Sequence, residues 1–119
     1  MARILVVDDA VFARMRLARL LMDNGYDVDE AANGAEALAK YKKQRPDAVL
    51  LDITLPDVVN GVEVLKEIIL HDPGAMVGMI SAMGQKSMVV EALEAGAKDF
   101  VVKPFDTARV LQAVQKLVS

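Results

Sequence analysis

The 119-residue sequence contains no cysteine and no tryptophan, and it has a single histidine, His71. The absence of cysteine excludes disulfides, thiolate catalysis and zinc sites built on cysteine, and one histidine is too few for a histidine metal cluster. His71 lies in the segment LHDPG, where we expect a helix end and a turn, so we expect it at the surface. Aromatic residues make up only 4% of the chain, which leaves few side chains to enclose a flavin ring.

Long apolar runs and basic runs are also absent. The apolar stretches are far shorter than the roughly 20 residues that span a bilayer, and the amino-terminal MARILVVDD meets two acids too early for a secretory signal. The net charge of −3 gives nucleic-acid binding little electrostatic support. With 54% hydrophobic and 26% charged residues, we expect one globular domain over residues 1–119, located in the cytoplasm and without a membrane partner.

Two kinds of segment alternate along the chain. Short apolar stretches rich in β-branched residues predict five strands, at 3–7, 27–31, 48–51, 76–80 and 99–102. Longer stretches with apolar residues at helical spacing follow each of them. This strict alternation predicts an α/β fold, with a parallel five-stranded sheet and helices on both of its faces. Near-continuous apolar character predicts that the first, third and fourth strands are central, whereas the more alternating second strand is expected at an edge.

Five polar side chains come directly after predicted strands. Asp8 and Asp9 follow the first strand, Asp52 follows the third, Ser81 the fourth and Lys103 the fifth. The carboxyl ends of parallel strands share one edge of a sheet, and ligands of open α/β sheets bind there, so we expect these side chains to converge. Each residue alone is explained as well by a solvated turn, a helix cap or a surface lysine. Their shared position is what indicates a functional site.

The chemistry of such a cluster follows from its charges. Carboxylates that converge repel one another unless positive charge lies among them. Oxygen ligands without histidine or cysteine favour Mg²⁺, with Mn²⁺ as an alternative, over zinc. Lys103 adds an ammonium group and Ser81 a hydroxyl donor. A cation, an ammonium and a hydroxyl around a carboxylate predict a site for a phosphoryl group, and an aspartate can itself accept that group as an acyl phosphate.

Several motifs resemble the receiver domains of two-component response regulators. They are VVDD before residue 10, AANGAEAL from residue 31, LLDITLP around Asp52, ISA with Ser81, and GAKDFVVKPF with Lys103. The resemblance covers essentially the whole chain, and SAMGQ with AGAKDFVVKPF is similar to the stand-alone chemotaxis regulators of that family. It implies a flavodoxin-like, doubly wound fold of five βα units with strand order 2-1-3-4-5.

The resemblance also implies a role for each residue of the cluster. Asp52 would be the phosphoacceptor, and Lys103 would pair with the phosphoryl oxygens. Asp9 and Asp52 would bind Mg²⁺ directly, together with the backbone carbonyl of Thr54. Asp8 would assist through water.

A conformational switch is implied in the same way. The Ser81 hydroxyl would donate to the phosphoryl group and move toward it, and Phe100 would rotate inward into the space that this movement leaves. Phosphorylation adds roughly −1.5 to −2 charges and three acceptor oxygens, so Ser81 and Lys103 would gain partners. The bond before Pro104 would be cis, an isomer that costs little only before proline.

The partners implied are those of a signalling protein and not of an enzyme, although the protein would assist its own phosphorylation and dephosphorylation. A histidine kinase would supply the phosphoryl group, and a phosphatase is a further expected partner. The output would be the binding of a target protein through the fourth helix, fifth strand and fifth helix. We expect a monomer with a target in flagellar motor control, without an output domain and without nucleic acid. The alternative is a phosphorelay intermediate or another non-motility regulator.

One departure from the family lies beside the expected site. The segment PDVVNG places four residues between Pro56 and Gly61, where the family commonly has three. We expect the additional residue to enlarge the loop or to shift the start of the third helix, and so to affect the acyl-phosphate lifetime and the fit of the kinase.

The first predicted helix carries two apolar stripes. Leu17, Leu20 and Leu21 form one, and Phe12, Met15 and Met22 form the other. One helix cannot easily bury both. We therefore hypothesise that Phe12 and Met15 belong to a kinase-docking face, against the alternative that they pack partly on the last helix.

Two other classes of protein share parts of this pattern. Aspartate-nucleophile phosphatases also use magnesium, lysine and a strand-end aspartate, but they need a second aspartate two residues after the nucleophile, where this chain has Thr54. A flavodoxin-like electron carrier would need a phosphate-cradling loop after the first strand, where this chain has DDAVF. Both interpretations are therefore weaker than the phosphorylation switch.

Overall fold

The computed structural model describes residues 1–58 and 60–119, in which five strands alternate with five helices. The strands are β1 (Arg3–Val7), β2 (Asp27–Ala31), β3 (Ala48–Asp52), β4 (Val77–Ser81) and β5 (Asp99–Val102). The helices are α1 (Val11–Asp23), α2 (Gly34–Gln44), α3 (Gly61–His71), α4 (Lys86–Ala95) and α5 (Thr107–Val118). All neighbouring strands pair in parallel, in the order β2-β1-β3-β4-β5. The predicted doubly wound fold and its strand order are confirmed.

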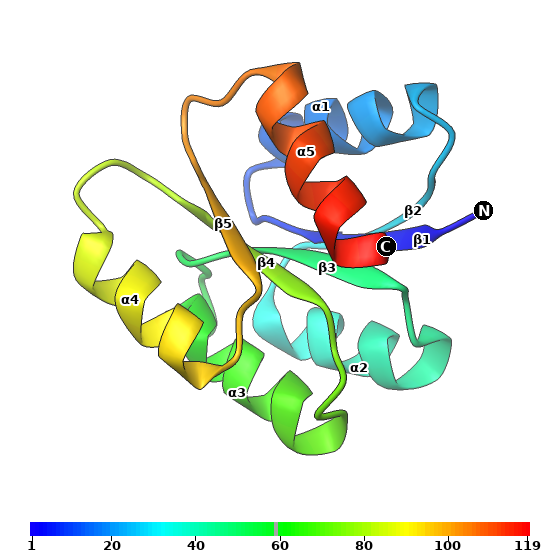
Figure 1. Cartoon of the computed structure of the whole chain (residues 1–119). Coiled ribbons are helices and arrows are strands. Elements are labelled where there is room, and N and C mark those ends of the chain that lie inside the picture. The colour runs from blue at the N-terminus through cyan, green and yellow to red at the C-terminus, as the bar shows by residue number, and fades with distance from the viewer. Residues whose placement is uncertain (59) are drawn as a thin grey trace.

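Helices cover both faces of the sheet, with α1 and α5 on one side and α2, α3 and α4 on the other (Figure 1). Side chains along β1 alternate between the two faces. Ile4 and Val6 pack in the cluster under α1 and α5, and Leu5 and Val7 pack in the cluster under the other three helices. Central strands therefore need apolar side chains at nearly every position, which is why they read as continuous apolar runs. None of the helices within the two described ranges is long and apolar enough to cross a membrane.

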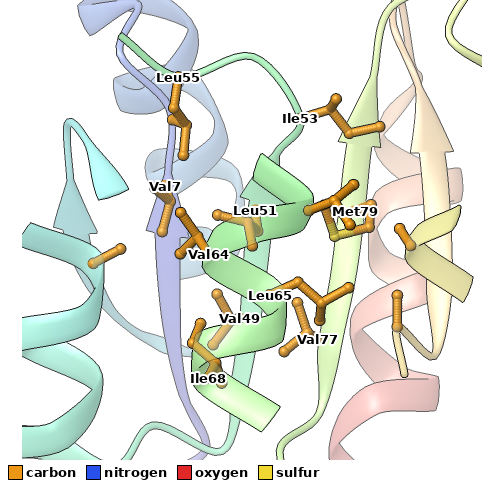
Figure 2. Close-up of a cluster of buried hydrophobic side chains, with 14 of the residues drawn as sticks. Val7, Val49, Leu51, Ile53, Leu55, Val64, Leu65, Ile68, Val77 and Met79 are labelled. Carbon is orange, nitrogen blue, oxygen red and sulfur yellow. The ribbon is translucent and has the colours of Figure 1, made fainter. Parts of the chain in front are cut away.

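The larger core cluster fixes α3 against the centre of the sheet (Figure 2). Its fully buried members include Val49, Leu51, Val77 and Met79 from the strands and Val64, Leu65 and Ile68 from α3. Burying one such side chain contributes roughly 1.5–3 kcal/mol. The strand that ends in Asp52 is therefore held in a rigid frame.

Two strands extend one residue further than the sequence predicts. Asp52 and Ser81 are the last residues of β3 and β4, and do not come after them. Asp52 pairs with Ile80, and Ser81 pairs with Val102 across the sheet. The apolar pattern misses these positions because it ends a strand at its last apolar residue, whereas the main-chain ladder pairs polar residues equally well. β4 also begins at Val77 and not at Met76, although the apolar character of Met76 predicts a strand residue.

The start of α3 lies directly against the end of β3. A Cβ atom at Gly61 would lie 2.2 Å from the carbonyl oxygen of Asp52 and 2.9 Å from the Cα atom of Ile53. The Gly61 amide also donates to the Ile53 carbonyl. Glycine is required here because no other residue allows the two backbones to approach so closely.

The loop before α3 reaches across to α2. The Asp57 carboxylate accepts hydrogen bonds from the amides of Gly34, at 2.7 Å, and Ala35, at 2.9 Å, in the first turn of α2. These bonds lower the pKa of the Asp57 carboxyl. The additional residue found in the sequence, between Pro56 and Gly61, falls in this loop. Val59 of the same loop lies outside the described residues. The start of α3 is capped by Asn60, whose side chain accepts from Val62 N at 2.9 Å.

Candidate functional site

Asp8 and Asp52 converge on one ammonium group, that of Lys103. The Lys103 Nζ atom lies 3.1 Å from Asp8 Oδ2 and 2.8 Å from Asp52 Oδ2. β1 and β3 are neighbours in the sheet, and Lys103 reaches their ends from the segment after β5. Residues far apart in the sequence thus form one compact group at the carboxyl edge of the sheet, as their strand-end positions predict.

Each carboxylate is oriented by its own loop. Asp8 Oδ1 accepts from Ala10 N at 2.9 Å, and Asp52 Oδ1 accepts from Thr54 N at 2.9 Å. Both contacts join an aspartate to the amide two residues later, the arrangement of an Asx turn. One oxygen of each carboxylate is therefore fixed by backbone, and the other faces Lys103.

Burial sets the electrostatics of the group, since Asp8 is 2% exposed and Asp52 is 6% exposed. Burial raises the pKa of the Asp52 carboxyl, and the opposing effects of Lys103 and Thr54 do not cancel that rise. Burial lowers the pKa of Lys103, but its hydrogen bonds and charge interactions with Asp52 and Asp8 outweigh this and raise it. Lys103 is therefore positive at neutral pH, and further positive charge near Asp52 would favour its ionised form.

Asp9 follows Asp8 and is exposed at the rim of the site. Within the parts of the chain that the structure describes, no three histidine, aspartate or glutamate side chains form a compact metal centre. The site instead offers two buried carboxylates and a third at the next position in the chain, with the Lys103 ammonium balancing one of these charges. Donors that are all oxygen and an excess of negative charge fit a hard divalent cation.

Ser81 and Phe100 lie on the α4 side of this group. Ser81 is 1% exposed, and its carbonyl oxygen accepts from the Lys103 backbone N–H at 2.7 Å. Phe100 is partly buried and packs against the core cluster under α2, α3 and α4. Both line a hollow of about 340 Å³ between the loop after β4, α4 and β5. The Lys103–Pro104 bond is cis, as the resemblance implies.

Gln85 joins two loops of the site, and sequence reasoning did not single it out. Its Oε1 accepts from Ala82 N at 2.7 Å, and its Nε2 donates to Thr54 Oγ1 at 3.1 Å. Its position four residues after Ser81, in SAMGQ, is the only sequence signal, and a glutamine before a helix has no distinctive pattern.

Arg14 is a second residue that sequence reasoning missed. Its Nη1 donates to the Asp8 carbonyl at 2.8 Å, and its Nε pairs with Glu30 at 3.0 Å. This ties the loop that carries Asp8 and Asp9 to β2. The first helix contains three arginines, and nothing in the sequence distinguishes Arg14 from the other two as a residue of the site.

The second apolar stripe of α1 is exposed. Phe12 is 82% exposed and Met15 is 53% exposed, whereas Leu17 and Leu21 are buried. A hollow of about 620 Å³ along α1 is lined by Phe12 and Met15 together with Arg16 and other residues. The structure therefore leaves the proposed docking residues accessible, next to the acidic edge of the sheet.

Known proteins are similar to this chain in sequence. Residues 4–115 match the family described as response regulator receiver domain. The chain is 52% identical over 116 residues to the chemotaxis protein CheY of Thermotoga maritima, covering 97% of this chain and 96% of that protein. It is also 52% identical over 118 residues to chemotaxis protein CheY of Bacillus subtilis, covering 98% of each.

A solved structure of a receiver domain is also similar to this chain. The receiver domain of NtrX from Brucella abortus superposes with a TM-score of 0.93 at 36% identity, covering 97% of each chain.

Proposed function

This chain belongs to the response regulator receiver family, and on that premise we propose that it is a switch activated by phosphorylation of Asp52. The relatives from Thermotoga maritima and Bacillus subtilis are chemotaxis proteins, and this chain acts in two-component signalling.

The observation that carries the proposal is the buried Asp52 carboxylate, held 2.8 Å from Lys103 with Asp8 beside it. Asp52 Oδ2 attacks the phosphorus of a phosphohistidine on the kinase. A phosphorus–oxygen bond forms, the phosphorus–nitrogen bond breaks, and the imidazole nitrogen leaves with the bonding electron pair and takes up a proton. Lys103 offsets the negative charge on the transferred oxygens, while the Thr54 amide keeps the other Asp52 oxygen in place.

The same donors would hold Mg²⁺, with Mn²⁺ as the alternative. Its ligands would be the carboxylates of Asp9 and Asp52 and the backbone carbonyl of Thr54, with Asp8 assisting through water. When bound, the cation supplies positive charge that offsets the carboxylates and the phosphoryl oxygens. The raised pKa of the Asp52 carboxyl supports this part of the proposal, because Lys103 alone compensates the buried negative charge poorly.

The output part of the proposal concerns Ser81 and Phe100. The Ser81 hydroxyl donates to the phosphoryl group, and Phe100 turns toward the hollow that both residues line. The surface of α4, β5 and α5 changes in consequence and binds the target protein. Val90, Leu93 and Val102 on this surface, and Met83 in the loop before α4, are exposed apolar side chains that suit a protein partner.

For the partners, we propose a histidine kinase that docks on α1 through Phe12 and Met15, a downstream target and a phosphatase. The chemotaxis relatives favour a target in flagellar motor control. We propose that the protein acts in the cytoplasm as a monomer, and as a signalling protein and not an enzyme.

The experiment that tests the acceptor uses purified protein, Mg²⁺ and a small phosphodonor such as acetyl phosphate. Wild type should gain one phosphoryl group by intact-mass spectrometry, and Asp52→Asn should gain none. Equal labelling of the two proteins would remove Asp52 from the acceptor role.

Docking is tested by the rate of transfer from a phosphorylated kinase to Phe12→Ala and Met15→Ala. Slower transfer from the kinase with unchanged labelling by acetyl phosphate supports the docking face. Unchanged transfer rates in both variants would remove it.

A further inference from the structure

Gln85 occupies the residue before α4, a position whose side chain commonly caps the helix. Here the side chain makes no hydrogen bond to the first turn of α4. Its backbone carbonyl accepts from Val89 N at 3.0 Å, so the helix begins without help from the carboxamide. The carboxamide is therefore committed to other contacts.

Those contacts connect the two loops at the edge of the acceptor site. Gln85 Oε1 accepts from Ala82 N at 2.7 Å, and Gln85 Nε2 donates to Thr54 Oγ1 at 3.1 Å. The Thr54 amide in turn donates to Asp52 Oδ1 at 2.9 Å. We call the contacts of Gln85 with Ala82 and Thr54 the Gln85 bridge. A continuous path of hydrogen bonds runs through it from the Asp52 carboxylate to the residue after Ser81.

The bridge fixes one end of a rigid unit. The Ala82 N–H and the Ser81 carbonyl belong to one planar peptide group. The carbonyl accepts from Lys103 N at 2.7 Å, and the N–H donates to Gln85 at 2.7 Å. One end of this peptide is held by the sheet ladder and the other by a single side chain. The orientation of the Ser81–Ala82 peptide therefore depends on the Gln85 side chain as well as on Lys103.

In this arrangement the Ser81 hydroxyl is not engaged by the acceptor group. Among the side chains that the structure describes, Lys103 bonds to Asp8 and Asp52, and Asp52 bonds to Lys103 and the Thr54 amide. A turn of the Ser81–Ala82 peptide that carries the hydroxyl toward a phosphoryl group on Asp52 would break or lengthen the Ala82–Gln85 bond.

We propose that Gln85 is a positioning residue that holds the Ser81 loop in its resting place, so that the Gln85 bridge opposes the phosphorylated arrangement. This inference rests on the proposed roles of Asp52 and Ser81. Gln85 makes no contact with the phosphoryl group in this proposal, because it acts on Ser81 only through its hydrogen bonds to Ala82 and Thr54.

The test is the affinity of the protein for beryllium trifluoride, a phosphoryl mimic, in the presence of Mg²⁺. Gln85→Met keeps the length of the side chain but removes both hydrogen bonds. It should bind the mimic about fivefold more tightly than wild type, the effect of one net hydrogen bond released from the resting state. Titrations followed by backbone amide NMR give the half-saturating concentration and report the Ala82 amide directly.

Three variants serve as controls. Ser87 lies in the exposed first turn of α4. The Ser87→Ala variant should bind the mimic as wild type does. Thr54→Val removes only the Thr54 half of the bridge, so its gain in affinity should be smaller than that of Gln85→Met. Gln85→Glu keeps an oxygen acceptor for Ala82, and its Ala82 amide resonance should stay near the wild-type position.

The outcomes separate this proposal from the one on which it rests. If Gln85→Met binds the mimic no more tightly than wild type, Ser81 engages by side-chain rotation alone and the bridge restrains nothing. A lower thermal midpoint with unchanged affinity overturns the proposal equally, because it indicates a merely structural role. If wild type itself fails to bind the mimic, or Asp52→Asn binds it equally well, the proposed function falls and this inference falls with it.

Discussion

Replacing Gly61 by alanine should destabilise the protein by about 3 kcal/mol. The new Cβ atom would lie 2.2 Å from the Asp52 carbonyl oxygen and 2.9 Å from the Ile53 Cα atom. Both belong to the backbone at the buried end of β3, so no change of rotamer relieves the contact. Either α3 or the end of β3 has to move by roughly 1 Å to restore ordinary van der Waals separation. Overpacking of a core costs typically 1–3 kcal/mol, and a clash between two backbones belongs at the upper end of that range.

Thermal unfolding followed by far-ultraviolet circular dichroism measures the effect. A loss of about 3 kcal/mol corresponds to a fall of roughly 10 °C in the midpoint for a domain of this size. Gly74→Ala is the matched control, because its Cβ atom would lie 3.5 Å from Asp72 Oδ1, an ordinary contact in an exposed loop. The control should stay within about 0.5 kcal/mol of wild type. A Gly61→Ala variant as stable as the control would refute the close approach of α3 to β3.

Three further predictions concern charge and metal. Asp52→Asn should become more stable relative to wild type as the pH rises through the raised pKa of the Asp52 carboxyl, because ionising the buried carboxyl then destabilises the wild type. Urea unfolding at a series of pH values measures the difference in unfolding free energy. A stability advantage of Asp52→Asn that grows toward acid pH would contradict this prediction. Asp57→Ala should lower the thermal midpoint above the ordinary aspartate pKa of about 3.9, because the carboxylate bonds to the amides of Gly34 and Ala35. That deficit should vanish as the pH falls through the lowered pKa of the Asp57 carboxyl, and a deficit that persists in acid refutes the charge-assisted bond. Mg²⁺ should raise the thermal midpoint by binding only the folded state, and Asp9→Asn should reduce that rise; an equal rise in both proteins would exclude Asp9 as a ligand.

The parts of the fold that the sequence predicts are those decided by burial pattern. β1, β2 and β5 have the predicted bounds. The grouping of Asp8, Asp52 and Lys103 is predictable from the sequence alone, because the carboxyl ends of parallel strands share one edge. The strand order comes from the family resemblance, since periodicity alone does not decide which strands are neighbours.

What the sequence does not predict are contacts made by single polar side chains between loops. Gln85, Arg14 and Asp57 each bond to groups that lie far from them in the chain, and no periodic pattern marks them. Asp57 is visible in the sequence only as part of an enlarged loop, and its bonds to the first turn of α2 depend on the path of that loop in space. Such partners are set by tertiary geometry, so a pattern along the chain cannot contain them.

The central claim is that Asp52 becomes the aspartyl phosphate, and chemical mapping of the modified residue tests it most directly. Protein labelled with acetyl phosphate and Mg²⁺ is treated with sodium borohydride, which reduces an acyl phosphate to the alcohol, and is then digested for peptide mass spectrometry. The account predicts homoserine at position 52, with unmodified aspartate at Asp8 and Asp9. Homoserine at Asp8 or Asp9, or a labelled protein without homoserine at position 52, would contradict it.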